Sequence, residues 1–139
     1  MIELLKSSVK AAKLFKENCG DYRFEFQLNG LFDPHVIAGY DERGYLFTGY
    51  SVQGQLLFAM IAYPTTHYGH VHVSHLLLAD DQAGEFVYIF AVACIPEFRG
   101  LLVKALRQMI TNEFPNQTCV YGCRRDHFTR PVPIRREHR

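Results

Sequence analysis

Tryptophan is absent from the 139 residues, and an excess of charge of either sign is also lacking, because the formal net charge is only +1. A chain so close to neutral has no overall attraction for nucleic acid. Nowhere does the sequence approach the run of about 20 apolar residues that a membrane-spanning helix needs, so we expect no membrane partner. Apolar residues make up 48% of the chain and charged residues 21%, which is typical of a folded globular protein.

Cysteine is scarce too, with Cys19, Cys94, Cys119 and Cys123 as its four occurrences. Polar residues interrupt the apolar ones near the N-terminus every two or three positions, so no secretory leader is expected. A reducing, cytoplasmic setting follows, in which these cysteines do not form a disulfide framework. Cys119 and Cys123 have the wrong spacing for a zinc or redox CxxC motif, and both fall on one face of a strand. We predict them to be buried thiols.

The basic residues are unevenly distributed along the chain. Residues 124–139 contain six arginines against two acids, a local net charge of +4, whereas residues 1–123 carry −3. We therefore predict a domain over 1–123 followed by a basic C-terminal arm over 124–139. Pro131 and Pro133 argue against a helix there, so the arm is expected to be extended or to form an edge strand. A disordered tail that only adds solubility is the alternative.

Apolar residues recur at helical spacing near the N-terminus, with lysines between them. This pattern predicts an amphipathic helix of about four turns that ends at Asn18-Cys19-Gly20. The apolar positions are Ile2, Leu5, Val9, Ala12 and Phe15. Beyond this helix, the alternation of residues 22–26 predicts a short strand. Asp33-Pro34 indicates a break, and residues 30–39 are assigned no element.

From residue 44 onward the sequence has the pattern of a sheet. Residues 45–52 and 55–63 flank Gln53-Gly54 and predict a hairpin, and alternation over 70–78 predicts a third strand. Residues 86–95 are apolar almost throughout, which is typical of a central strand covered on both faces.

A second amphipathic helix follows the central strand and closes near Pro115, and residues 118–123 predict a fifth strand. The unit over 86–123 is long enough for a right-handed parallel crossover. The fold class is therefore α+β (mixed α/β): an N-terminal helix, an antiparallel meander, then a strand-helix-strand crossover. Leu102, Leu106, Met109, Ile110 and Phe114 mark the second helix.

The junction between the central strand and the second helix reads IPEFRGLLVKAL over residues 95–106. A helix that begins directly after a strand directs its free N–H groups and the positive end of its dipole toward the strand's carboxyl end, where phosphate binds well. Gly100 allows a close approach of the backbone, and Arg99 adds a cation. The same residues also suit an ordinary tight turn, so both interpretations stay open at this point.

The stretch IPEFRG, followed by a helix containing KAL, resembles the acetyl-CoA loop of the GNAT superfamily of N-acetyltransferases. The order of elements over about residues 40–123 is also similar. The resemblance implies that the backbone after Arg99-Gly100, including Leu101 and Leu102, holds the CoA pyrophosphate. It also implies that the pantetheine arm lies between the strands at 86–95 and 118–123, and that acetyl-CoA donates an acyl group to an amine.

The chain departs from this family pattern in two places. Leu102 stands where the family has a further glycine, and the distance to Lys104-Ala105-Leu106 is one residue short. Past residue 123, the segment is too short for the family's final hairpin. The chain also resembles small phage-encoded members, which keep a similar junction and an Arg-rich end. This resemblance implies a location in the host cytoplasm or a virion if the chain is phage-encoded. Toxin-activating acyltransferases, which use acyl carrier protein, are a less similar group.

Acyl transfer to an amine requires proton transfers, and the central strand offers two groups by position. Glu85 is the candidate base and Tyr88 the candidate acid. The alternatives are a solvated charge at a strand end for Glu85 and core packing for Tyr88. Tyr121 could likewise either contact the ligand or pack in the core. Glu97 matches a position of the family's loop, where it contributes structure.

Four histidines lie close together in the sequence between residues 67 and 75. His70 and His72 project to one face of the expected strand and His75 to the other, so only two of them converge. A zinc site needs three or four ligands, and we therefore predict no metal site.

Two functions remain open. The first is a divergent N-acyltransferase that acts on a small amine or a protein lysine. The second is a non-catalytic GNAT-fold binding protein, virion-associated if phage-encoded, whose arm over 124–139 contacts protein or nucleic acid. The intact PEFRG stretch favours the first, and Leu102 favours the second.

Overall fold

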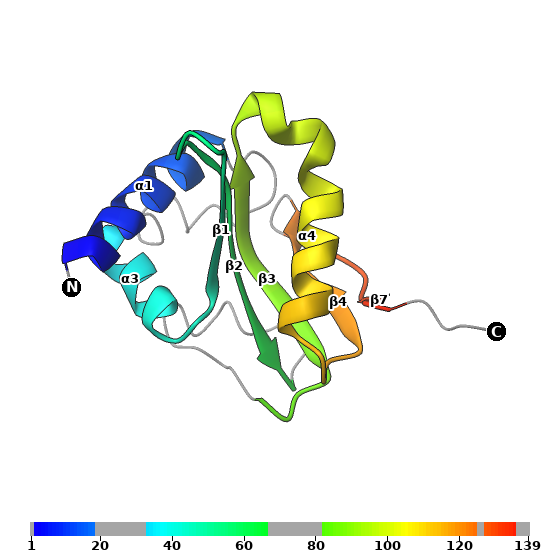
Figure 1. The fold of residues 1–139 in the computed structure, drawn as a ribbon. Helices are drawn as coiled ribbons and strands as arrows, with labels where there is room; N and C mark the ends of the chain where they lie inside the picture. Colours follow the sequence, from blue (N-terminus) through cyan, green and yellow to red (C-terminus); the bar gives the residue numbers. More distant parts are fainter. Residues whose placement is uncertain (1, 19–32, 67–81, 125–126, 136–139) are drawn as a thin grey trace.

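The computed structural model describes residues 2–18, 33–66, 82–124 and 127–135. These residues form a five-stranded mixed sheet in the order β1-β2-β3-β4-β7 and a separate pair of short strands, β5-β6. Helices α1 and α3 cover one face of the five-stranded sheet, and α4 covers the other (Figure 1). The expected α+β class, with a helix between two parallel strands, is confirmed.

Helix α1 (Ile2–Asn18) confirms the amphipathic helix predicted at the N-terminus. Its buried side includes Ala11, Leu14 and Phe15, while the lysines at positions 6, 10, 13 and 16 are exposed. The apolar stripe thus places α1 on the sheet, where it also contacts α3.

Helix α3 (Pro34–Glu42) occupies part of the segment to which the sequence assigned no element. The Asp33 side chain accepts a hydrogen bond from the amide of His35 at 2.8 Å, and Pro34 is the first residue of the helix. An aspartate cap followed by proline at the first position is a common helix start. Asp33-Pro34 therefore begins a helix instead of merely breaking the chain, and Ile37 and Tyr40 anchor this helix in the core.

The predicted hairpin is present as β1 (Leu46–Tyr50) and β2 (Leu56–Thr65). These strands pair antiparallel, from Leu46 opposite Ile61 to Tyr50 opposite Leu56. The turn closes through a 2.9 Å hydrogen bond from the Gly54 amide to the Ser51 carbonyl. Gly54 has a φ of +86°, a backbone conformation that residues other than glycine rarely adopt.

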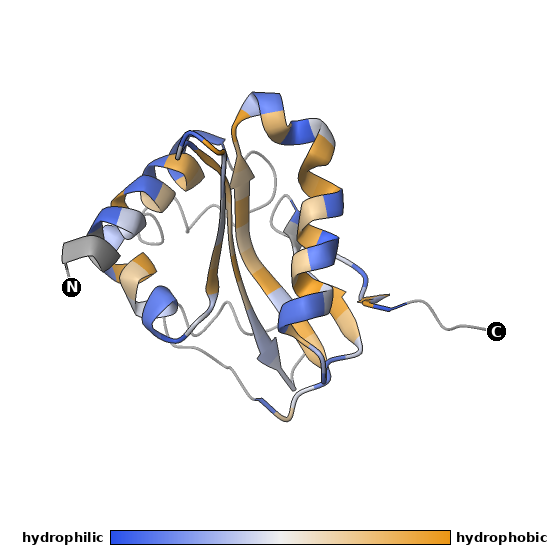
Figure 2. Cartoon of the chain, viewed as in Figure 1, coloured by the Kyte–Doolittle hydropathy of each residue, from blue (hydrophilic) through white to orange (hydrophobic). Residues whose placement is uncertain are grey.

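Strand β3 (Phe86–Cys94) is the central strand, as predicted, and most of it is apolar (Figure 2). It pairs antiparallel with β2, with one irregularity: Ile61 faces Ala91 and Ala62 faces Ile89. Phe90 is thus an extra residue on β3, which makes a β-bulge in the middle of the strand.

The crossover after β3 runs through a 3₁₀ turn, η2 (Pro96–Phe98), and helix α4 (Arg99–Glu113) to β4 (Cys119–Tyr121). Strand β4 is parallel to β3, which confirms the strand-helix-strand prediction. Leu102, Leu106 and Met109 of α4 pack toward a cluster of buried residues that includes Met60 and Val87 of the sheet.

Part of segment 124–139 joins the body of the protein. Strands β5 (Cys123–Arg124) and β6 (His127–Phe128) pair with each other, and β7 (Val132–Pro133) pairs antiparallel with β4 at the sheet edge. Ile134 is only 9% exposed in the cluster under α4. The expected edge strand near Pro131 and Pro133 is therefore present, and it contributes to the core.

Other expectations lie outside the described residues. These are the strand at 22–26, the strand at 70–78 and the histidines between 67 and 75. Within the described ranges, no helix combines the length and apolar character needed to cross a membrane.

Candidate functional site

Strands β3 and β4 run together for only three residue pairs and then part. The last pair is Tyr88 with Tyr121. Residues 89–94 of β3 have no ladder partner on the β4 side within the described part of the chain, although β2 accompanies them on the other side. Gly122 lies where the strands part, and a Cβ at this position would come within 3.4 Å of the Ile89 carbonyl oxygen. The paired part of the two strands thus ends at Tyr88 and Tyr121, and β5 still approaches β3 beyond it. This end of the parallel pairing is called the splay below.

The N-terminus of α4 lies at this same carboxyl end of β3. The first four N–H groups of a helix, here those of residues 98–101, have no acceptor within the helix. The Phe98 amide donates to the Ile95 carbonyl at 3.0 Å, and the Arg99 amide donates to the Pro96 carbonyl. No side chain caps the helix. The amides of Gly100 and Leu101 therefore have no acceptor within α4 itself, and the 3₁₀ turn over Pro96–Phe98 leads directly into the helix before them.

The side chains around these amides leave room for a ligand. Leu102, which stands in place of the family's glycine, packs against the cluster between α4 and the sheet. Leu101 is 60% exposed, and a Cβ built on Gly100 would meet no atom within 4 Å. The bulk of Leu102 is consequently directed into the core.

Arg99 supplies a positive charge near the end of β3. The thiol of Cys94, the last residue of the strand, is buried, and burial raises its pKa; the charge of Arg99 acts in the opposite direction. Arg99 is exposed and is the first residue of α4. Arg99, Gly100 and Leu101 thus form one cluster of positive charge and helix-end amides.

The two proton-transfer candidates occupy different positions. Tyr88 belongs to the last β3–β4 pair and is fully buried, with its ring centroid 4.9 Å from that of Tyr121. Glu85 precedes the strand at its opposite end and is exposed, and its carboxylate accepts a hydrogen bond from the Thr118 hydroxyl at 3.5 Å. The structure brings Tyr88 to the splay and leaves Glu85 about 10 Å further back, at roughly 3.3 Å per strand residue.

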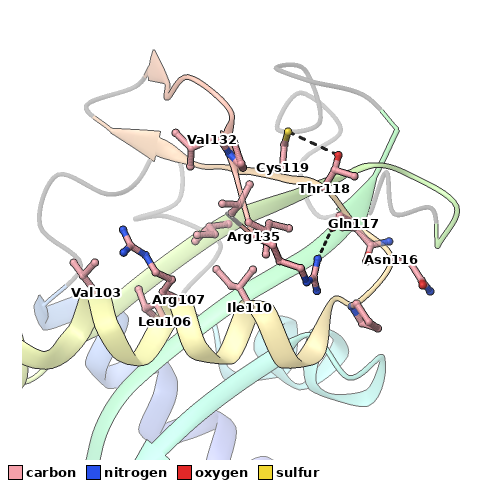
Figure 3. Close-up of a pocket in the computed structure, with 15 residues that line it drawn as sticks. Val103, Leu106, Arg107, Ile110, Asn116, Gln117, Thr118, Cys119, Val132 and Arg135 are labelled. Carbon is pink, nitrogen blue, oxygen red and sulfur yellow. Dashed lines mark hydrogen bonds between the residues drawn. The ribbon is translucent and has the colours of Figure 1, made fainter. Parts of the chain in front are cut away.

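A second concave feature lies on the α4 side of the sheet, between that helix and strands β4 and β7 (Figure 3). This feature, called the α4 groove below, has a volume of about 1210 Å³. Its walls include Arg107 and Arg135, neither of which the sequence singled out. Arg135 lies within a run of arginines, and Arg107 lies on an otherwise ordinary amphipathic helix, so no sequence signal distinguished them.

Arg135 has a structural role within the α4 groove. Its guanidinium donates to the carbonyls of Thr111 and Phe114 at 2.8 Å and to that of Gln117 at 2.9 Å. The last carbonyls of a helix have no N–H donor within the helix. A cation at this end also interacts favourably with the helix dipole. Arg135 therefore fastens the end of α4 to the loop before β4.

Neither a protein-family model nor a curated protein sequence matches this chain. Among solved structures, a GNAT-like decarboxylase, GphF, in complex with isobutyryl-CoA has a similar fold, with a TM-score of 0.56 and 15% identity. The fold is GNAT-like. The match covers 84% of this chain and 60% of the decarboxylase chain. At this level of identity the likeness concerns the fold.

Among the described side chains, no group of three or more His, Cys, Asp and Glu residues could hold a metal ion. The histidines between 67 and 75 lie outside that part of the chain.

Proposed function

We propose that this protein binds acyl-CoA and transfers its acyl group to an amine. The observation that carries the proposal is the uncapped N-terminus of α4 at the carboxyl end of β3, beside a parallel strand pair that parts after three residues. Support for the ligand class comes from the similarly folded decarboxylase, which is described in complex with isobutyryl-CoA.

In this proposal, the diphosphate of CoA accepts hydrogen bonds from the amides of Gly100 and Leu101, and Arg99 adds its charge. The pantetheine arm then lies along residues 89–94 of β3. Its amide groups pair with backbone groups of the strand that have no ladder partner on the β4 side. The thioester reaches the point where the strands part, beside Tyr88 and Tyr121.

The reaction needs little covalent help from the protein. The amine nitrogen attacks the thioester carbonyl, the C–N bond forms, and the C–S bond breaks. The nitrogen loses a proton and the departing thiolate gains one. Tyr88 is the better placed of the two candidates and would act as the acid for the thiolate, while Glu85 serves as base only for an amine that reaches the outer end of β3. The acceptor is an amine-bearing small molecule or a protein lysine, and acetyl-CoA is the simplest donor.

A non-catalytic acyl-CoA-binding protein is the second candidate, and the sequence of β3 favours it. Residues 86–94 read FVYIFAVAC and contain no carboxylate and no imidazole, and the flanking acids Glu85 and Glu97 lie outside the strand. Such a protein would retain the site at α4 and would release no CoA thiol.

The test is to titrate acetyl-CoA and isobutyryl-CoA into the protein and to follow thermal unfolding, which ligand binding to the folded state shifts upward. We expect saturable stabilisation by both ligands. Arg99→Ala should weaken binding about tenfold because one charge-assisted contact is lost. Lys104→Ala, which removes another exposed cation of α4, serves as the control and should bind like the parent.

Release of CoA thiol in the presence of amine acceptors then separates the two candidates. Binding without thiol release supports the non-catalytic protein. If millimolar acyl-CoA leaves the unfolding temperature unchanged, and Arg99→Ala behaves like the parent, both candidates are wrong.

A further inference from the structure

The α4 groove has an apolar floor and, among its described lining residues, one cation that is not committed to other contacts. The floor is formed by Ile89, Leu106, Ile110, Val120 and Ile134, which come from β3, α4, β4 and the segment after β7. On its two sides, Val103 is 66% and Val132 is 50% exposed. Ligand sites have volumes of about 300 to 1000 Å³ and mostly apolar linings. The α4 groove, at about 1210 Å³, is larger than this range and shares the apolar lining.

Arg107 is the available cation. Apart from the backbone bonds of α4, its hydrogen bond within the described chain is at its carbonyl, which accepts from the Thr111 hydroxyl at 2.8 Å, so the guanidinium has no partner among the described residues. By contrast, the donors of Arg135 are committed to three carbonyls. Of the described residues that line the groove, Arg107 thus provides one positive charge for a ligand, on the α4 wall (Figure 3).

The floor offers little to a peptide backbone. Cys119 and Val120 pair with β3 on one side and with β7 on the other, so their backbone groups are used within the sheet. An extended peptide laid on this face would leave its own N–H and C=O groups without partners. An alkyl chain has no such groups and loses nothing there.

We propose that the α4 groove binds a medium-length alkyl carboxylate, with the chain on the apolar floor and the carboxylate on Arg107. The wall from Val103 to Ile110 is about 10 Å long at roughly 1.5 Å per helical residue, which suits a chain of this class. The site does not use the amides of Gly100 and Leu101, and Ile89 is the one residue that it shares with the β3 segment of the proposed acyl-CoA site. Binding in the groove is therefore tested at residues of α4 that the acyl-CoA proposal does not use.

The experiment uses the full chain and decanoate as the probe, with methyl NMR as the readout. We expect saturable shifts in the methyl signals of Leu106 and Ile110, while the amide signals of Gly100 and Leu101 stay in place. Shortening the chain to octanoate should weaken binding about fifteenfold, because each buried methylene changes affinity about fourfold. Decanol, which has the same chain without the charge, should bind at least tenfold more weakly than decanoate.

The matched variants are Arg107→Ala and Lys104→Ala, two exposed cations of α4 of which only the first lines the groove. Arg107→Ala should lower the affinity for decanoate to that for decanol. Lys104→Ala should leave the affinities for both ligands unchanged. Equal binding of decanoate and decanol to the parent would overturn the proposal, as would the absence of methyl shifts at millimolar decanoate. A concentration-dependent dimer that shifts the same methyl signals and is not dissociated by decanoate would also overturn it, in favour of a second copy of the chain.

Discussion

Gly100 and Gly39 are both helical glycines, and a Cβ built on either meets no atom within 4 Å. Replacing either by alanine should raise the free energy of unfolding by up to about 1 kcal/mol, because glycine is the more flexible residue in the unfolded chain. The two should differ in ligand binding. At Gly100 the new methyl group lies next to the amide that the diphosphate approaches, so Gly100→Ala should weaken acyl-CoA binding at least tenfold.

Chemical denaturation and calorimetric titration of both variants check this prediction. Gly39→Ala is the control, with the same gain in stability and unchanged affinity for acyl-CoA. Parent-like affinity in Gly100→Ala would mean that the diphosphate does not contact this amide.

Arg135 allows a second prediction at the scale of a single residue. Removing its guanidinium leaves the carbonyls of Thr111, Phe114 and Gln117 without this donor. Arg135→Ala should lower the free energy of unfolding by about 1 to 3 kcal/mol, the usual range for hydrogen bonds from a charged group. Arg135→Lys should recover only part of this loss, because an ammonium group cannot reproduce the planar fork.

Urea denaturation of the two variants measures the effect, with Arg130→Ala as the matched control. Arg130 belongs to the same basic segment and is exposed. If Arg130→Ala and Arg135→Ala lowered the free energy of unfolding by the same small amount, the contacts of Arg135 at the end of α4 would contribute nothing to stability.

Individual elements show where sequence reasoning succeeds. Helix α1, the hairpin β1–β2, strand β3 and helix α4 follow from apolar periodicity and turn residues, which act locally. Helix α3 does not follow from the sequence pattern, because Asp-Pro indicates a chain break as readily as a helix start. In the structure, Asp33 caps the helix and Pro34 is its first residue. A proline can either end a helix or occupy the first position of a new one, and the residues that follow it decide between these two cases.

The candidate site depends on relations between elements that no local pattern encodes. The junction residues Arg99 and Gly100 were predicted from sequence, and their position at the carboxyl end of β3 follows from chain order alone. The parting of β3 and β4 after Tyr88 depends instead on pairing register, which long-range packing decides. The α4 groove lies where α4 leaves part of one sheet face open beside β4 and β7. Its existence depends on how these elements pack together, which sequence periodicity does not encode.

At the scale of the whole molecule, residues after 123 contribute to the fold as well as to the charge distribution. Strand β7 extends the sheet, Ile134 fills the cluster under α4, and Arg135 fastens the end of that helix. One of the six arginines behind the charge of +4 on residues 124–139, Arg135, therefore makes hydrogen bonds within the protein. Deleting the whole segment would disturb the domain and would not isolate a partner-binding arm.

Two truncations test this division. A chain ending at Arg135 keeps every contact named above and should unfold at the same urea concentration as the parent. A chain ending at Cys123 loses β7, Ile134 and Arg135 together. It should lose at least about 3 kcal/mol of unfolding free energy, since burial of one isoleucine alone contributes roughly 1.5 to 3 kcal/mol and the helix-end hydrogen bonds add to it. Circular dichroism and urea denaturation report both results. Parent-like cooperative unfolding of the shorter chain would show that residues 124–135 are dispensable to the core and would restore the view of this segment as a separate arm.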